Sequence, residues 1–330
     1  MPRRNQATLT VEEILQGTRL GRTQSVGHME VIPILDDGDA ADDTFAPPYF
    51  SAGTQNYGSV RVQNMDPDRP TIVPTGSGFV TSQRAQDHAT SGAKFLKPGE
   101  NKTIEGAMCI QETQGGLIRQ EEDTMLVVLP ASMRASILAM RNDGDYSRAW
   151  PYIREFNASV GVPGAGDLVN FLREYDRQLD EFVAEFELLP NQIGAIVLVG
   201  GRVVGVERAP NVPFWEKLWV PLVRVCYGSL ALRTARVLGD QPPATRTALT
   251  VQDKSLAGIK QALRDARVKA EGLIEAAYNE VRSTPLLYAE GAEGKLGGAE
   301  LFTVANTRLA GQMVRRGALA SYVSLCAPGL

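Results

Sequence analysis

The densest group of polar side chains in the sequence lies between residues 76 and 88. Gly76 and Gly78 have no side chain, so a ligand could approach the backbone closely there. The amides of such a glycine-rich turn can bind an anion. A bulged hairpin with a polar outer face is the alternative, because the spacing matches neither a phosphate-binding loop nor a dinucleotide fingerprint. The predicted ligand-binding residues are Gly76, Gly78, Arg84, Gln86, Asp87 and His88.

Four residues are candidates for catalysis, although none belongs to a recognisable catalytic motif. His88 could act as a base, but neighbours along a strand point to opposite faces, so Asp87 does not orient it by adjacency alone. Cys109 would need a nearby base or positive charge, such as His88 or Arg84, to become a nucleophile. Glu112 leads into an acidic group that is more typical of a solvated surface. Enzymatic activity is therefore undecided, with His88, Asp87, Cys109 and Glu112 as the candidates.

The residue types argue against a bound metal ion or cofactor. Five aspartates crowd residues 36–43, but a calcium loop also needs a downstream glutamate that is missing here. Cys-x-x-Cys and His-x-x-x-His pairs, which zinc sites use, do not occur in the sequence. Cys109, Cys226 and Cys326 lie far apart among apolar neighbours, which predicts buried free thiols in a reducing compartment. We expect no metal site and no cofactor.

Composition places the chain among ordinary globular proteins. Of its 330 residues 43% are apolar and 22% are charged, which is enough to build a large core. The net charge of −4 disfavours nucleic acid as a partner, because nucleic-acid-binding proteins usually carry a basic surplus. No apolar run reaches the roughly 18 residues that a membrane span needs, and no signal peptide is recognisable. We therefore expect no membrane partner and a cytoplasmic location, in a cell or in an infected host.

Secondary-structure signals change along the chain from strands to helices and back. Short apolar runs separated by glycine, proline, asparagine and aspartate predict antiparallel strands over residues 57–129. Helical spacing follows in residues 131–141, 146–159 and 166–188. Three short β runs close the chain, at residues 300–306, 308–314 and 318–325.

Residues 192–228 are the most informative segment for the fold. Two β runs flank Gly200-Gly201, and a two-residue primed turn favours positive φ at both of its central positions. In residues 215–226, which follow the hairpin, apolar side chains recur every three or four positions. This spacing predicts the apolar face of a helix. That face comprises Trp215, Leu218, Trp219, Leu222, Val223 and Cys226.

A long helix with an almost heptad apolar stripe is predicted over about residues 250–283. We expect the stripe, from Leu256 to Val281, to pack on the protein's own sheet, while self-association through this helix stays open. The fold class is therefore α+β, a single domain with mainly antiparallel sheet, packed helices and a long late helix. We expect an N-terminal arm with a short helix over residues 1–24 and one domain over residues 25–330. A weak boundary near residues 239–249 is the one candidate for a division.

Several short motifs occur in an order that resembles one known family. The motifs are Gln86-Asp87-His88, Cys109, Trp150-Pro-Tyr-Ile153, Gln192-Ile-Gly-Ala-Ile, Gly201, Val-Gly205-Val-Glu, Trp215, Tyr227 and Gly317–Val323. Their order resembles the ARG and rhodanese-phosphatase-superfamily-associated protein domain over about residues 25–326, with Gln192-Ile-Gly-Ala as the best anchor. The resemblance implies a genomic association with ADP-ribosylglycohydrolases, and hence a link to ADP-ribose or NAD-derived metabolites.

The sequence departs from the family pattern at three positions. His88 stands where the family usually has arginine, Phe79 where an acidic residue follows glycine, and Gln111 where the family has glutamate. If those charges bind an anionic ligand in the family, this chain has lost part of that site.

Two function classes therefore stay open. The first is a ligand-binding domain, with hydrolysis as an option, for a nucleotide-derived small molecule linked to ADP-ribose or NAD. The second is a non-catalytic structural or assembly protein, such as a phage-type component, that self-associates through the Leu256–Val281 helix; a virion location would then apply.

Overall fold

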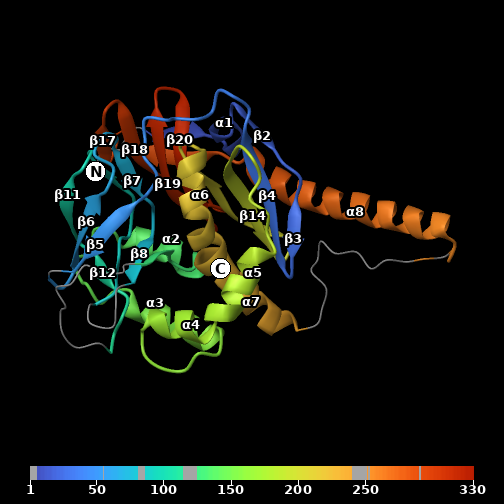
Figure 1. The fold of residues 1–330 in the computed structure, drawn as a ribbon, viewed down its shortest axis with the longest axis horizontal. Coiled ribbons are helices and arrows are strands. Elements are labelled where there is room, and N and C mark those ends of the chain that lie inside the picture. Colours follow the sequence, from blue (N-terminus) through green and yellow to red (C-terminus); the bar gives the residue numbers. More distant parts are fainter. Residues whose placement is uncertain are drawn as a thin grey trace.

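The computed structural model describes residues 6–54, 56–80, 86–113, 125–239, 251, 253–289 and 291–330 (Figure 1). Helix and strand occupy nearly equal shares of the chain, and the strand pairings of the described residues are antiparallel. This confirms the α+β class and the mainly antiparallel sheet. The division into an arm and one domain stays a prediction. Most of the candidate boundary at 239–249 lies outside the described residues.

The largest sheet of the described residues has eleven strands in the order β1-β16-β18-β19-β20-β15-β14-β4-β2, with β17 on β18 and β3 on β4. It joins strands from both ends of the chain. Its strands are β1 (Gln6–Leu9), β2 (Thr18–Leu20), β3 (Gln24–Val26), β4 (Met29–Asp36), β14 (Gln192–Val199), β15 (Arg202–Arg208), β16 (Leu286–Ala289), β17 (Gly294–Leu296), β18 (Ala299–Ala305), β19 (Ala310–Arg316) and β20 (Leu319–Cys326).

The centre of this sheet contains the predicted hairpin. β14 pairs with β15 across Gly200 and Gly201, whose φ angles of 60° and 79° are those of a primed turn. β14 is buried along its whole length because it has paired strands on both sides and its side chains belong to the hydrophobic clusters on both faces of the sheet. The hairpin therefore forms the middle of the fold.

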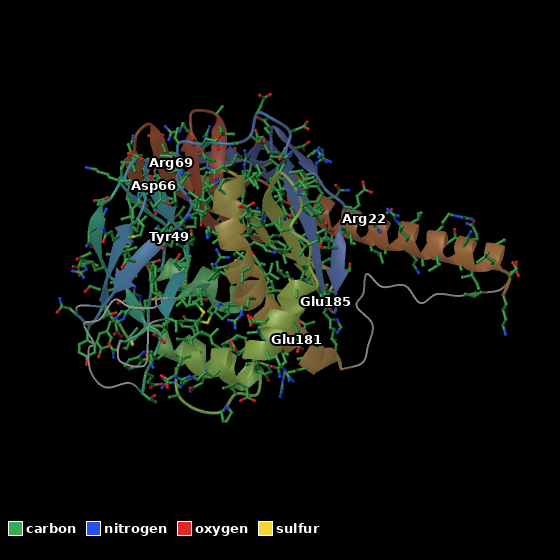
Figure 2. All side chains as sticks on the ribbon, viewed as in Figure 1. Arg22, Tyr49, Asp66, Arg69, Glu181 and Glu185 are labelled. Carbon is green, nitrogen blue, oxygen red and sulfur yellow. The ribbon has the colours of Figure 1, made fainter. Side chains whose placement is uncertain are left out.

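Three smaller sheets contain the β-rich segment predicted at 57–129. They lie on the side of the molecule away from the long helix (Figure 1). Asp66 and Arg69 form an ion pair of 3.1 Å at the turn after β6 (Figure 2). The strands are β5 (Phe50–Gly53), β6 (Ser59–Asn64), β7 (Thr71–Val73), β8 (Ser77–Val80), β9 (His88–Ala89), β10 (Lys94–Leu96), β11 (Asn101–Glu105), β12 (Met108–Cys109) and β13 (Met125–Val128).

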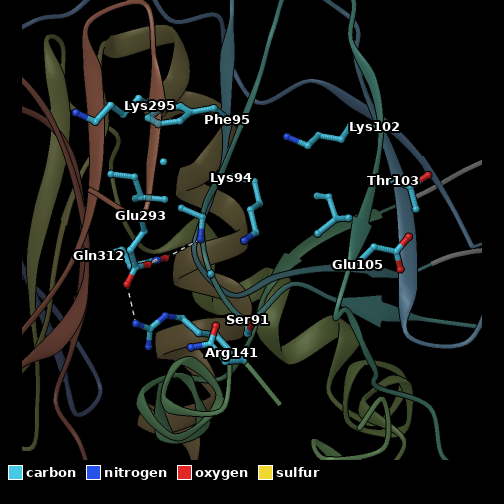
Figure 3. A pocket seen from close by; sticks show the side chains of 16 residues that line it. Ser91, Lys94, Phe95, Lys102, Thr103, Glu105, Arg141, Glu293, Lys295 and Gln312 are labelled. Atoms are coloured by element: carbon cyan, nitrogen blue, oxygen red, sulfur yellow. Dashed lines mark hydrogen bonds and ion pairs between the residues drawn. The ribbon is translucent and has the colours of Figure 1, made fainter. Parts of the chain in front are cut away.

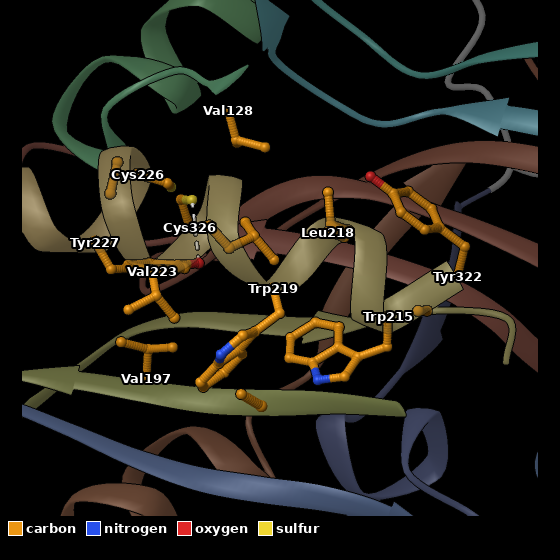
Figure 4. Close-up of a cluster of buried hydrophobic side chains, with 14 of the residues drawn as sticks. Val128, Val197, Trp215, Leu218, Trp219, Val223, Cys226, Tyr227, Tyr322 and Cys326 are labelled. Carbon is orange, nitrogen blue, oxygen red and sulfur yellow. Dashed lines mark hydrogen bonds between the residues drawn. The ribbon is translucent and has the colours of Figure 1, made fainter. Parts of the chain in front are cut away.

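The helix predicted after the hairpin, which contains Trp215 and Trp219, crosses the core as three consecutive segments. These are α6 (Val212–Pro221), a π-helix (Leu222–Tyr227) and α7 (Gly228–Leu238). The π-helix follows Pro221, which has no N–H to donate to the helical ladder. All six residues of the predicted apolar face are buried, in a cluster that includes Tyr227 and Tyr322 (Figure 4). The predicted face is confirmed, and the π-helix is an addition that the spacing did not show.

The prediction of a single helix over residues 166–188 is wrong. The segment is divided into α4 (Leu168–Glu174) and α5 (Asp176–Ala184) at Tyr175, whose hydroxyl donates to the carbonyl of Val160 at 2.7 Å. Glu181 and Glu185 lie on the solvent side of this region (Figure 2). Two further helices, α2 (Ala131–Ala139) and α3 (Trp150–Ser159), confirm the helices predicted before it.

The long helix α8 (Leu256–Arg282) differs from the prediction in what it contacts. Of its residues only Ile274 and Val281 are buried, next to the short helix α1 (Val11–Ile14) and β15. Its N-terminal half projects away from the body (Figure 1), and Leu256, Leu263 and Val268 are 70%, 54% and 68% exposed. The expectation that the whole stripe packs on the protein's own sheet is therefore wrong for that half.

Candidate functional site

The two glycines of the polar segment accommodate the protein's own side chains. Gly76 has a φ of 72°, and a Cβ there would lie 3.4 Å from Nε of Arg134. A Cβ on Gly78 would lie 2.7 Å from Cγ2 of Val127 on the neighbouring strand. Both positions thus need glycine for internal packing. Their role in ligand binding stays a prediction.

Gln86, Asp87 and His88 lie in the interior, with exposed fractions of 3%, 2% and 0%. Nδ1 of His88 is 3.1 Å from the carbonyl of Gln86 and 3.2 Å from the hydroxyl of Thr54. Its Nε2 is buried and has no hydrogen-bond partner among the described residues. Burial lowers the pKa of His88, although the hydrogen bond to Gln86 opposes this shift. A base at this position would therefore be neutral near pH 7.

The other candidates for catalysis are held by structural contacts. The thiol of Cys109 donates to the carbonyl of Gln111 at 3.1 Å, and burial raises its pKa. Glu112 accepts from Arg154 and, at 2.6 Å, from the amide of Gly166. Arg84 lies outside the described residues, so its position relative to His88 stays a prediction.

A cavity of about 730 Å³ lies between β10 and β11, the loop after α2, and β17 with its neighbours (Figure 3). Two other cavities have volumes of about 330 and 60 Å³. The lining of the 730 Å³ cavity begins at Ser91, three residues after His88. In the chain this cavity therefore adjoins the predicted ligand-binding segment. The lining residues are Ser91, Gly92, Ala93, Lys94, Phe95, Lys102, Thr103, Ile104, Glu105, Arg141, Asn142, Glu293, Gly294, Lys295, Leu301 and Gln312.

The lining carries four cationic and two carboxylate side chains, a net charge of plus two. Lys94 and Lys102 come from two different strands, and Lys102 extends into the space from the β11 side (Figure 3). Both are exposed, and neither forms an ion pair with a described residue. Arg141 binds Glu293 at 2.6 Å. The free positive charges of Lys94 and Lys102 therefore face an open cavity in an otherwise acidic protein.

Gln312, a polar residue of the cavity lining, is held by several hydrogen bonds. Gln312 is 1% exposed; its Oε1 accepts from the amide of Ala93 at 2.6 Å and from the hydroxyl of Thr75 at 3.0 Å. Its Nε2 donates to Glu293 at 3.2 Å. A Cβ on Gly92 would lie 3.0 Å from this amide oxygen, so glycine leaves the space that Gln312 occupies.

A buried ion pair is connected to Gln312 through Thr75. Nη1 of Arg134 donates to Glu207 at 2.7 Å, and its Nη2 contacts the carbonyl of Thr75 at 3.4 Å. Tyr227 and Ser324 each donate to Glu207 at 2.6 Å. Burial opposes the charge on Arg134, but Cys326 and Glu207 outweigh it and raise the pKa of this guanidinium. A continuous polar chain thus connects the ion pair with the cavity through Thr75 and Gln312.

Sequence reasoning missed the cavity residues. Lys94, Lys102, Arg141, Lys295 and Gln312 come from separate elements, and no short motif joins them. The available signal was weak: the polar segment continues through Ser91 and Gly92 into Lys94.

The described residues contain no group of three or more histidine, cysteine or acidic side chains arranged to hold a metal ion. In the same part of the chain, helices are too short or too polar for a bilayer crossing.

Fold and cavity together define an α+β protein with a basic cavity of ligand size. The chain belongs to the family described as the ARG and Rhodanese-Phosphatase-superfamily-associated Protein domain, whose sequence pattern matches residues 17–290. The family resemblance is thereby confirmed, although β17, β18, β19 and β20 lie beyond the match. Comparisons with curated proteins and with solved structures gave no match.

Proposed function

We propose that the chain binds a small anionic molecule of the ADP-ribose or NAD-derived class in the cavity beside Lys94 and Lys102. The observation that carries the proposal is the pair of lysines, which face this cavity of about 730 Å³ without an ion-pair partner among the described residues. The volume lies within the range of about 300–1,000 Å³ that is typical of small-molecule sites.

Charge and polarity support a ligand with two unlike ends. The ammonium groups of Lys94 and Lys102 suit phosphate oxygens, because both are cationic donors at the solvent side. The carboxylates of Glu105 and Glu293 can accept from ribose hydroxyls or an exocyclic amine. The family description names an association with ARG proteins, which supports the ADP-ribose class in particular.

A thermal-shift comparison tests the ligand class. We expect ADP-ribose to raise the melting temperature of the full chain in a saturable manner, because a ligand that binds the native state stabilises it. Adenosine, which has the base and ribose but no phosphate, should give a much smaller shift. Equal shifts with adenosine and ADP-ribose would contradict a site based on lysines. If ADP-ribose binds, chromatography of the ligand after incubation with the protein shows whether hydrolysis accompanies binding.

The second function class, a self-associating protein, is supported by a different observation. The N-terminal half of α8 exposes apolar side chains far from the cavity, on the other side of the body (Figure 1). Ligand binding and self-association are thus compatible, and neither depends on the other.

A further inference from the structure

The exposed half of α8 continues a face that is already used for packing. The apolar stripe of residues 256, 259, 263, 266, 270 and 273 lies on the same side of the helix as Val281, given 3.6 residues per turn. Val281 is covered by the body, whereas Leu263 and Leu273 are 54% and 40% exposed. The body therefore covers only one end of a continuous apolar stripe.

The charges beside this stripe change sign along the helix. Lys260, Arg264 and Arg267 lie along one flank of the first half. Glu271 and Glu275 continue the same flank in the second half, and all five side chains are exposed. Two of these side chains form contacts within the helix: Arg267 pairs with Glu271 at 2.7 Å, and Arg264 donates to Gln261. One flank thus has a basic end and an acidic end.

We propose that two copies of this chain pair through α8 in antiparallel orientation. A two-fold axis across the helix brings the same flank of both copies together, so the basic end of one meets the acidic end of the other. One register satisfies both the stripe and the charges. Leu263 packs on the partner's Leu273 and Ala266 on the partner's Ala270, while Arg264 faces the partner's Glu271 and Lys260 the partner's Glu275.

The attachment of α8 also favours this orientation. Each body holds its own helix at Ile274 and Val281, near the C-terminal end. An antiparallel pair places the two bodies at opposite ends, whereas a parallel pair would bring them together at one end. In this register residues 260–275 of the two copies overlap, over about 22 Å at 1.5 Å per residue. A helix pair of this length is at the small end of specific interfaces, so we expect a reversible dimer with a dissociation constant in the micromolar range.

Sedimentation velocity of the full chain tests the pairing from about 1 to about 300 µM, which brackets such a dissociation constant. We expect a concentration-dependent dimer that Leu263→Asp abolishes. Val268→Asp is the matched control, because Val268 is also exposed on α8 but lies on the opposite face. Circular dichroism should show that both variants remain folded.

A charge reversal distinguishes the antiparallel register from general stickiness. Arg264→Glu should weaken the dimer because it opposes the partner's Glu271, and the double variant Arg264→Glu with Glu271→Arg should restore it. A monomer at every concentration would overturn the proposal. Equal effects of Leu263→Asp and Val268→Asp, or a double variant no better than Arg264→Glu, would also overturn it.

Discussion

Arg134 on α2 and Glu207 on β15 form an ion pair whose side chains are only 3% and 1% exposed. The pair joins the helical layer to the central hairpin. Each partner is further bonded, Arg134 to Thr75 and Glu207 to Tyr227 and Ser324. A buried charge is tolerated only when its partner and its hydrogen bonds are present. The ion pair therefore fixes how α2, and the cavity next to it, sits on the sheet.

Removal of one partner of this pair should be costly. Arg134→Met leaves the carboxylate of Glu207 buried without its cation, so we expect a loss of about 3–5 kcal/mol in the free energy of unfolding. Urea denaturation measures this loss. Arg154→Gln is the control, because the Arg154–Glu112 pair is 48% and 22% exposed and should contribute less than about 1 kcal/mol. Similar losses in both variants would contradict the role of the buried pair.

Two glycines should respond in opposite directions to substitution by alanine. A Cβ on Gly205 would overlap the hydroxyl of Tyr227, so Gly205→Ala should cost about 1–3 kcal/mol through overpacking. Gly272 lies on α8, and such a Cβ would meet no atom within 4 Å apart from its chain neighbours and the helix's own backbone, so Gly272→Ala should stabilise its helix by about 0.5–1 kcal/mol. Thermal or urea unfolding of both variants checks the prediction, which a destabilised Gly272→Ala would contradict.

His88 should make the stability depend on pH. Burial lowers its pKa from the ordinary 6.5, so the unfolded chain binds a proton at pH values where the folded chain does not. The contribution of His88 is therefore complete above about pH 6.5 and is lost as the pH falls from there toward the lowered value. Urea denaturation at several pH values should show a smaller pH dependence in His88→Asn than in the natural chain. An unchanged dependence would contradict the prediction.

The three cysteines should be slow to react in the folded protein. Cys109, Cys226 and Cys326 are free and buried, and burial raises the pKa of Cys109. Because the exposed thiolate is the reactive species, a disulfide reagent at about pH 8 should label none of them rapidly. All three should react in denaturant. Val268→Cys supplies an exposed thiol as the positive control, and rapid labelling of the natural chain would contradict the buried positions.

Local signals predicted the local structure well. Thr10 and Glu13 form both hydrogen bonds of a capping box, at 3.2 and 2.6 Å, at the start of the short helix predicted within residues 1–24. The primed turn at Gly200 and Gly201 is also confirmed. In each case a few neighbouring residues fix the backbone, so the sequence contains the whole cause.

Long-range features could not be predicted in the same way. The cavity depends on strand pairings and packing between distant segments, which bring Lys94 and Gln312 to one cavity. The periodicity of α8 predicts a helix with an apolar face but does not show what covers that face. The division of the helix at Tyr175 is marked by neither glycine nor proline, so the helical spacing of residues 166–188 did not show it.

The central claim is that the lysines of the cavity bind the anionic ligand. Isothermal titration calorimetry with ADP-ribose tests it on the natural chain, on Lys94→Gln combined with Lys102→Gln, and on Lys217→Gln, an exposed lysine of α6 outside the cavity lining. We predict saturable binding that the double variant weakens at least about tenfold, or about 1.4 kcal/mol, and that Lys217→Gln leaves unchanged. Binding that is absent from the natural chain, or equal in all three proteins, would contradict the account.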